Sequence, residues 1–284
     1  MRILMTWVLV LAWAVAAGAQ QNPDFTREIA PFRIADGLYY VGSADLAAYL
    51  VVTPQGDILI NSNLETSPPQ IARSVAALGQ RLGDIKVLLI SQAHFDHVAG
   101  SAEMVRRTGA RYMVMDADVA AIESGGKRGT PRPDFTTYPP AKVDRILHDG
   151  DTVRLGGTVL TAHKTAGHTP GCTTWTMRAR DRGREYSVLI LGGPGNNRGT
   201  PLVGNKLYPD IAADFAHGFE TLRALPCDIF LGAHGAYFGL AAKRAALQPG
   251  GPNPFVDPSG CRTAITQAQT YFEAALARDR AAAR

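Results

Sequence analysis

The sequence is poor in charged residues, which make up 19% of its 284 positions, and it holds only three cysteines. Apolar residues reach 46%, so the composition is that of a globular chain and excludes disorder over most of its length. It has no collagen-like or heptad repeat, which excludes fibrous and coiled-coil architectures. The net charge of +4 comes from scattered basic residues with no basic run interleaved with aromatics, so we expect no nucleic-acid partner.

A long hydrophobic run occurs at the N-terminus and nowhere else in the sequence. Arg2 precedes an almost uninterrupted apolar run from Ile3 to Ala17, which ends in the small residues Ala17-Gly18-Ala19. This order of basic, apolar and small residues is typical of a secretory signal peptide. The alternative is a transmembrane anchor, but roughly 15 residues is short of the about 20 that span a bilayer. We predict that residues 1–19 are cleaved, that the protein is exported and that no membrane anchor remains.

The three cysteines leave the disulfide pairing open. In an exported protein, two of Cys172, Cys227 and Cys261 can form a bridge. Cys227 and Cys261 lie 34 positions apart, and a bridge between them would contribute about 4 kcal/mol through loop-closure entropy. The spacing alone does not choose the pair.

Short apolar runs alternate with helical patterns along the rest of the chain, and no linker-like stretch divides it. Two similar halves, each with strands followed by helices, predict an α/β fold in which two packed sheets carry helices on their outer faces. We predict a single domain over residues 20–284, with long loops at 125–140 and 192–209. The expected strands are 38–42, 47–53, 57–61, 86–90, 111–115, 151–155, 158–163, 173–180, 186–191 and 228–231, and the expected helices are 67–78, 101–108, 117–124, 211–225 and 263–280.

Four of the seven histidines lie just after predicted strands. Because strand ends at one edge of a sheet are where site residues converge, three separate segments can meet there in one cleft. Imidazole nitrogen and carboxylate oxygen are good zinc ligands, and one of these segments holds several donors within six residues. We interpret the other three histidines, at 148, 163 and 217, as ordinary core or surface groups. The candidate metal ligands are Gln92, His94, Asp96, His97, His168 and His234.

These segments resemble those of one enzyme family. Gln92-x-His94-x-Asp96-His97 is similar to the His-x-His-x-Asp-His motif of the metallo-β-lactamase superfamily, with Gln in the first place. Gly167–Gly171 resembles the family's second metal turn, and 225–234 resembles the segment that carries the last ligand in subclass B3. Stretches at 59–61, 125–127 and 204–209 are also similar to B3 segments, so the resemblance covers roughly residues 25–280.

The resemblance implies an αββα sandwich and a periplasmic zinc hydrolase that opens β-lactams, which include penicillins, cephalosporins and carbapenems. We expect a monomer whose partner is this small-molecule substrate. In such an enzyme a zinc-bound water, with its pKa lowered to about 7, attacks the lactam carbonyl, and Asp96 is the catalytic residue expected to orient it. The implied ligand sets, for one or two Zn²⁺ ions, are Gln92, His94 and His168 in one site and Asp96, His97 and His234 in the other. The implied disulfide is Cys227–Cys261, which leaves Cys172 free.

Two departures from the family pattern bear on the site. Gln92 replaces a histidine, and because a neutral amide oxygen is a poorer zinc donor than imidazole, we expect its site to be the weaker one. Many family hydrolases also have a metal-bridging Asp after the strand at 186–191, whereas residues 192–197 hold no carboxylate here. That absence disfavours glyoxalase-type and lactonase-type activity. Asn196 and Asn197 are the candidate substrate contacts in this loop.

Three alternative functions follow from the same residues. A serine hydrolase is disfavoured, because Ser124-Gly125-Gly126-Lys127 matches Ser-x-x-Lys in a loop-like context and no Ser-Asp-Asn or Gly-x-Ser-x-Gly occurs. A family hydrolase acting on a lactone or thioester is the second alternative. The third is a periplasmic zinc-binding protein without catalysis, in which Gln92 marks a decayed site.

Overall fold

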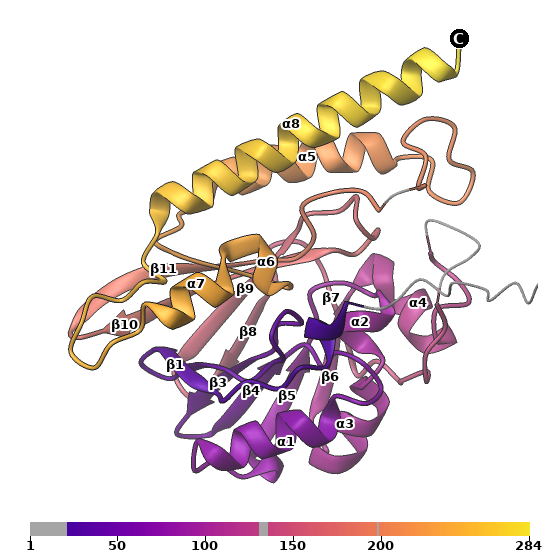
Figure 1. Ribbon diagram of the computed structural model, residues 1–284. Helices are drawn as coiled ribbons and strands as arrows, with labels where there is room; N and C mark the ends of the chain where they lie inside the picture. The colour runs from indigo at the N-terminus through magenta and orange to yellow at the C-terminus, as the bar shows by residue number, and fades with distance from the viewer. Residues whose placement is uncertain (1–21, 131–135, 198) are drawn as a thin grey trace, which may run out of the picture.

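Two β-sheets lie face to face with helices packed on their outer sides, as the computed structural model shows over residues 22–130, 136–197 and 199–284 (Figure 1). This arrangement confirms the predicted α/β fold and αββα sandwich. The predicted signal peptide, residues 1–19, lies outside the described residues, as do residues 131–135 of the predicted 125–140 loop. Within the described part of the chain, no helix has the length and apolar character needed to cross a bilayer.

The first sheet is built from the N-terminal half of the chain. Its first four strands pair in antiparallel fashion and the remaining pairs are parallel, so the sheet is mixed. In spatial order its strands are β1 (Phe32–Ala35), β2 (Leu38–Tyr40), β3 (Tyr49–Thr53), β4 (Gly56–Ile60), β5 (Ile85–Leu89), β6 (Arg111–Met115) and β7 (Arg145–Leu147).

The second sheet comes from the C-terminal half and is also mixed, because β12 joins β11 in parallel while the other pairs are antiparallel. In spatial order its strands are β12 (Ile229–Gly232), β11 (Arg184–Leu191), β10 (Thr173–Asp181), β9 (Thr158–Lys164) and β8 (Thr152–Leu155).

Helices cover both outer sides, with α1 and α3 against the first sheet and α5 and α8 against the second (Figure 1). The last helix begins at Pro258 rather than near 263, because Asp257 caps it by accepting a hydrogen bond from the Gly260 N–H. The helices are α1 (Pro68–Ala77), α2 (Phe95–Val98), α3 (Ser101–Thr108), α4 (Val119–Ser124), α5 (Ile211–Ala224), α6 (Gly235–Phe238), α7 (Leu240–Ala245) and α8 (Pro258–Ala282).

Side-chain alternation along the central strands explains the layering. In β4, Ile58 and Ile60 belong to the core between the sheets, whereas Leu59 belongs to the core under the first sheet's helices. In β5, Leu89 faces the inner core and Leu88 the outer one. Because successive residues of a strand point to opposite faces, strands apolar at every position are buried on both sides.

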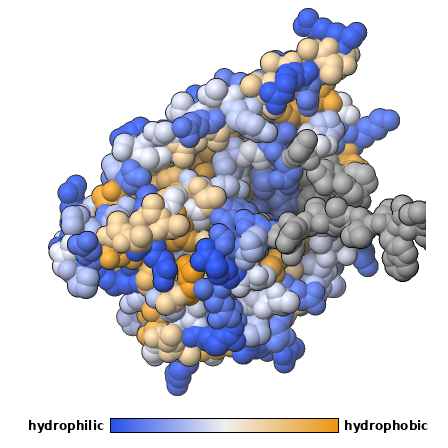
Figure 2. All heavy atoms as spheres, viewed as in Figure 1, coloured by the Kyte–Doolittle hydropathy of each residue, from blue (hydrophilic) through white to orange (hydrophobic). Residues whose placement is uncertain are grey.

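The surface keeps few large apolar groups. Figure 2 shows hydrophilic and hydrophobic side chains interspersed on the viewed face, without one continuous apolar area. Among the described residues, the large apolar side chains that stay exposed are Ile146, Leu207 and Tyr271. A disulfide joins Cys227, just before β12, to Cys261 in α8, while Cys172 is buried and free. The pairing that the resemblance implied is therefore the one observed.

Candidate metal centre

The candidate ligands converge where several strands end. Gln92 and His94 follow β5, and His94 is the N-cap of α2, so that the next residues, including Asp96 and His97, lie in that short helix. His168 lies in the turn between β9 and β10, and His234 follows β12 as the N-cap of α6. The structure thus brings the three predicted segments to one place.

Three of the ligands form a tight group, which we call the Asp96 group: the buried His97 and the partly exposed Asp96 and His234. Their donor atoms all lie within 4.8 Å of one another. The Nε2 atoms of His97 and His234 are 3.2 Å apart, and the Asp96 Oδ2 atom lies 3.6 Å from the former and 3.4 Å from the latter. Two imidazoles and a carboxylate are a ligand set that suits zinc, so the residues present fit the metal that the family implies.

Asp45 holds His234 from behind. The Asp45 Oδ2 atom lies 2.9 Å from His234 Nδ1, and its Oδ1 atom accepts a hydrogen bond from the Ala236 N–H at 2.8 Å. The Asp45 carbonyl also accepts from the Gly235 N–H at 2.6 Å. Because the carboxylate accepts from Nδ1–H, Nε2 is the His234 atom directed at the rest of the Asp96 group, and it can donate a lone pair once a metal displaces its proton.

The charge balance of this group favours a cation. Burial opposes ionisation of Asp96, but the neighbouring His97 and His234 outweigh it and hold the pKa of the carboxyl well below its usual range. Burial lowers the pKa of His97 to about 3, so this imidazole is neutral. Burial also disfavours the charged form of His234, yet hydrogen bonds with Asp45 and Asp96 raise its pKa to about 9. With Asp45 also ionised, two carboxylates face one imidazolium and the surroundings are net negative.

The remaining ligands form a second group beside the first, which we call the Gln92 group: Gln92, His94 and His168. The rings of His94 and His168 meet edge to face with centroids 4.5 Å apart. The two groups are close enough to interact electrostatically, because Asp96 interacts with both His94 and His168. Gln92 is buried, and its Oε1 atom accepts a hydrogen bond from the His94 N–H at 2.9 Å.

The loop after β11 shapes the Gln92 group through its backbone. The carbonyl oxygen of Gly195 is hydrogen-bonded to His168 Nδ1, which leaves Nε2 for a metal. A side-chain carbon at Gly193 would lie 2.5 Å from the His168 ring, and one at Gly192 would lie 2.6 Å from the Thr173 carbonyl oxygen. These two glycines are therefore needed for the loop to pack this closely on the ligand.

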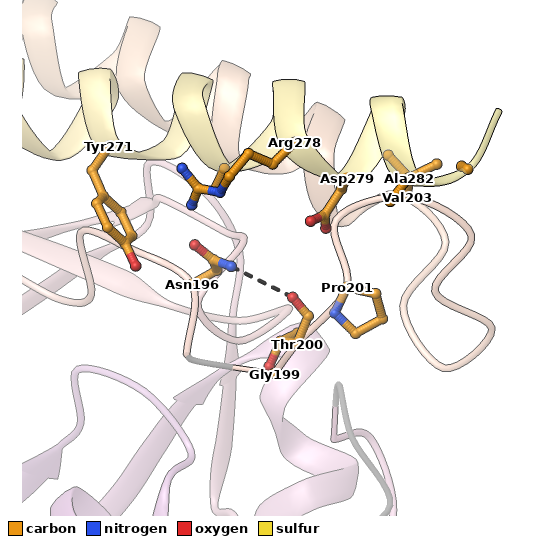
Figure 3. A pocket seen from close by; sticks show the side chains of 11 residues that line it. Asn196, Gly199, Thr200, Pro201, Val203, Tyr271, Arg278, Asp279 and Ala282 are labelled. Atoms are coloured by element: carbon orange, nitrogen blue, oxygen red, sulfur yellow. Dashed lines mark hydrogen bonds between the residues drawn. The ribbon is translucent and has the colours of Figure 1, made fainter.

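The predicted substrate contacts lie in the same loop. Asn196 donates from Nδ2 to the Thr200 carbonyl oxygen at 3.4 Å and lines a hollow of about 540 Å³ between the loop and α8 (Figure 3). Tyr271 and Arg278 lie on the α8 side of this hollow. Asn197 is exposed. A contact of either asparagine with substrate stays a prediction.

The residues interpreted as ordinary groups lie away from the ligands. His148 and His217 are mostly exposed, and His163 is hydrogen-bonded to Thr176 in the second sheet. Ser124 ends α4 and donates to the Ala120 carbonyl, so it does not open a helix as a serine β-lactamase motif requires.

Sequence reasoning missed three supporting residues. Asp45 lies in a loop without strand or helix periodicity, and Gly195 acts through its carbonyl, so neither carries a side-chain signal. Asp118, which accepts hydrogen bonds from the Ala93 N–H and the Thr169 hydroxyl, could have been found, because it follows β6 as the candidate ligands follow other strands.

Comparison with known proteins places this geometry in a family. Residues 47–234 match the Metallo-beta-lactamase superfamily. The native FEZ-1 metallo-beta-lactamase from Legionella gormanii is 50% identical, with a TM-score of 0.87 and coverage of 89% of this chain and 98% of that one. BJP-1, a subclass B3 metallo-beta-lactamase of Bradyrhizobium japonicum, is 36% identical, with a TM-score of 0.87 and coverage of 92% and 99%.

Curated relatives match over shorter stretches. A hydroxyacylglutathione hydrolase of Methylobacterium is 31% identical over 125 residues, which are 44% of this chain. The match spans less than half the length of these relatives: 42% of the hydroxyacylglutathione hydrolase and 36% of a probable metallo-hydrolase of Burkholderia pseudomallei. The family match, which covers most of the chain and includes the Asp96 group, is decisive: the chain belongs to the metallo-β-lactamase superfamily.

Proposed function

We propose that this protein is a zinc-dependent hydrolase of the β-lactam amide bond in penicillins, cephalosporins and carbapenems. The observation that carries the proposal is the tight Asp96 group beside the imidazoles of His94 and His168, in a chain that is 50% identical to a metallo-β-lactamase over 89% of its length. When bound, zinc supplies a Lewis acid and lowers the pKa of its water to about 7, so that hydroxide is available at neutral pH.

The residues of the chain divide the remaining tasks. Asp96, His97 and His234 would hold one Zn²⁺ ion, and Gln92, His94 and His168 would hold a second one more weakly. Asp96 is ionised and orients the attacking water through its carboxylate oxygens, while Asn196 and Asn197 contact the substrate. Asp45 and the Gly195 carbonyl keep His234 and His168 in the tautomers that a metal needs.

The setting of the reaction is also proposed. Residues 1–19 act as a signal peptide, and residues 20–284 form a single domain that works in the periplasm as a monomer. We propose no membrane anchor after cleavage and no nucleic-acid partner. The partner is the small-molecule substrate.

A thioester hydrolase is the second candidate, because one curated relative is a hydroxyacylglutathione hydrolase. The loop after β11 disfavours it. A bridging carboxylate would need a side chain at Gly192 or Gly193, where a Cβ would lie within 2.6 Å of the Thr173 carbonyl or of the His168 ring. No aspartate fits there unless the loop moves, so the β-lactam is the favoured substrate.

The test is hydrolysis of a carbapenem with and without a strong chelator, together with metal analysis. We expect the chelator to abolish hydrolysis and added Zn²⁺ to restore it. His97→Ala should lose activity, whereas His217→Ala, an exposed histidine on α5, should keep it. Undiminished turnover in metal-free protein would refute the proposal.

A substrate panel separates the alternatives. It contains a penicillin, a cephalosporin, a carbapenem, an acyl-homoserine lactone and a glutathione thioester. Turnover of only the lactone or the thioester would replace the proposed substrate class. Zinc binding without turnover of any compound would support a non-catalytic zinc-binding protein.

A further inference from the structure

A buried carboxylate lies between the two loops of the Gln92 group without belonging to either. Asp118 ends the short helical turn η3 (Asp116–Asp118), which follows β6, and it is fully buried. Burial raises the pKa of its carboxyl to about 6, against the effect of its hydrogen bonds. Burying a carboxylate costs free energy unless hydrogen-bond donors satisfy it. The donors that bind Asp118 therefore indicate which segments it positions.

Three donors meet this carboxylate, and they come from both ligand loops. The Asp118 Oδ2 atom accepts from the Ala93 N–H at 3.0 Å and from the Thr169 hydroxyl at 2.7 Å. Its Oδ1 atom accepts from the Gly171 N–H at 2.8 Å. Ala93 lies between two candidate ligands, Gln92 and His94, and Thr169 directly follows His168. One side chain therefore binds the backbone between Gln92 and His94 and the side chain of the residue that follows His168.

Surrounding contacts make the arrangement stiff. The Ala93 carbonyl accepts from the Tyr138 hydroxyl at 2.9 Å, so Ala93 is held on both of its backbone polar groups. Gly171 approaches so closely that a Cβ there would lie 2.6 Å from the Asp118 backbone nitrogen and 2.7 Å from its side chain. The approach of the second loop to the carboxylate thus requires glycine at this position.

We propose that Asp118 is a positioning residue for the Gln92 group: it sets the distance between the Gln92–His94 segment and the His168 segment, so that a metal ion can be held there although one ligand is a neutral amide. The proposal rests on the proposed function, because it concerns the same metal centre. The hydrogen bonds of Asp118 go to Ala93, Thr169 and Gly171 rather than to Asp96, His97 or His234, and Asp45 supports His234 separately.

The test is the Zn²⁺ affinity of metal-free protein, measured by competition with a chromophoric chelator. Thr169→Val removes one donor at nearly constant shape, and Asp118→Asn removes the charge. Outer partners of ligands typically change metal affinity by 10–100-fold. We expect the second Zn²⁺ equivalent to bind about tenfold more weakly in Thr169→Val and still more weakly in Asp118→Asn, with the first equivalent unchanged.

Rescue and control variants separate positioning from general damage. Thr169→Ser keeps the hydroxyl and should restore the affinity for the second equivalent. Thr53→Val removes another buried hydroxyl, which donates to the Gly56 carbonyl in the β3–β4 turn at the opposite end of the strands, and should change neither equivalent. If Asp118→Asn does not fold, the Zn²⁺ affinities of Thr169→Val and Thr169→Ser still test whether the contact positions the Gln92 group.

The outcomes keep this inference apart from the proposed function. If Thr169→Val and the unaltered protein bind Zn²⁺ with the same stoichiometry and affinity, the inference is overturned even if carbapenems are hydrolysed. The same holds if both proteins bind only a single equivalent. Weaker binding of the second equivalent by Thr169→Val, with no hydrolysis by the unaltered protein, would support the inference and contradict the proposed function.

Discussion

The two halves of the candidate metal centre are built from different chemistry. The Asp96 group contains an ionised carboxylate, and a second carboxylate, Asp45, lies behind His234. The Gln92 group offers an amide oxygen and two imidazoles and has no carboxylate ligand, and its outer partners include the Gly195 carbonyl behind His168 and Asp118 between the loops. The two groups are adjacent, and they differ in the charge of their ligands and in the residues that support those ligands.

This difference shows that two ligand triads of similar appearance need not bind Zn²⁺ with equal affinity. Attraction between a divalent cation and a carboxylate is strong where water is largely excluded, and an amide oxygen offers no such attraction. We expect the Asp96 group to bind the first Zn²⁺ equivalent. The Gln92 group then depends on how well its loops are positioned.

The largest expected effect comes from removing the charge of the Asp96 group. Asp96→Asn should weaken the first Zn²⁺ equivalent by more than about 100-fold, since changing an outer partner alone already costs 10–100-fold. Gln92→Ala should weaken only the second equivalent. Zinc titration of the two metal-free variants measures both values, and Asp36→Asn, an exposed carboxylate paired with Arg33, is the control. A larger loss of first-equivalent affinity in Gln92→Ala would reverse our ranking of the two groups.

An intermediate effect is expected from Asp45→Asn. An asparagine that keeps its oxygen on the Ala236 N–H turns its NH₂ toward His234 Nδ1, which places the imidazole proton on Nε2 and blocks the lone pair. We expect the first equivalent to bind about 10–100-fold more weakly and the second to be unchanged. Unchanged affinity for the first equivalent would show that Asp45 only supports the fold.

Much of this centre could be predicted from the sequence, because ligands that follow strands leave a pattern. His94, His168 and His234 each come after an apolar run, and the fold brings those strand ends together. Asp45 could not be predicted, since it lies 189 positions from His234 and tertiary packing alone pairs them. The Gly195 carbonyl could not be predicted either, because every residue has one and only the loop path selects it.

The fold shows the same division. Strands with an apolar run, such as β5 and β11, could be predicted, because consecutive residues of that run are buried on both faces of the sheet. Of two strands with three residues each, the sequence predicted β2 but not β7. β2 lies in a longer apolar run, whereas β7 follows a polar segment. β7 is a strand because it pairs with β6, and a sequence of three residues does not indicate that pairing.

The smallest expected effect is that of Gln92→His, which makes the two groups more alike. Imidazole is the better zinc donor, so the second Zn²⁺ equivalent should bind more tightly, on the order of tenfold. The substitution also removes Gln92 Oε1 from the His94 N–H at 2.9 Å, and an unsatisfied buried N–H costs about 1–3 kcal/mol. Metal-free Gln92→His should therefore unfold at a lower temperature than the unaltered protein. Excess Zn²⁺ should narrow this difference in unfolding temperature, because a ligand bound only by the folded state stabilises it.

Metal content and thermal unfolding with and without Zn²⁺ measure the two effects. Equal zinc content in both proteins would mean that the loop geometry, rather than the amide donor, limits binding at this group.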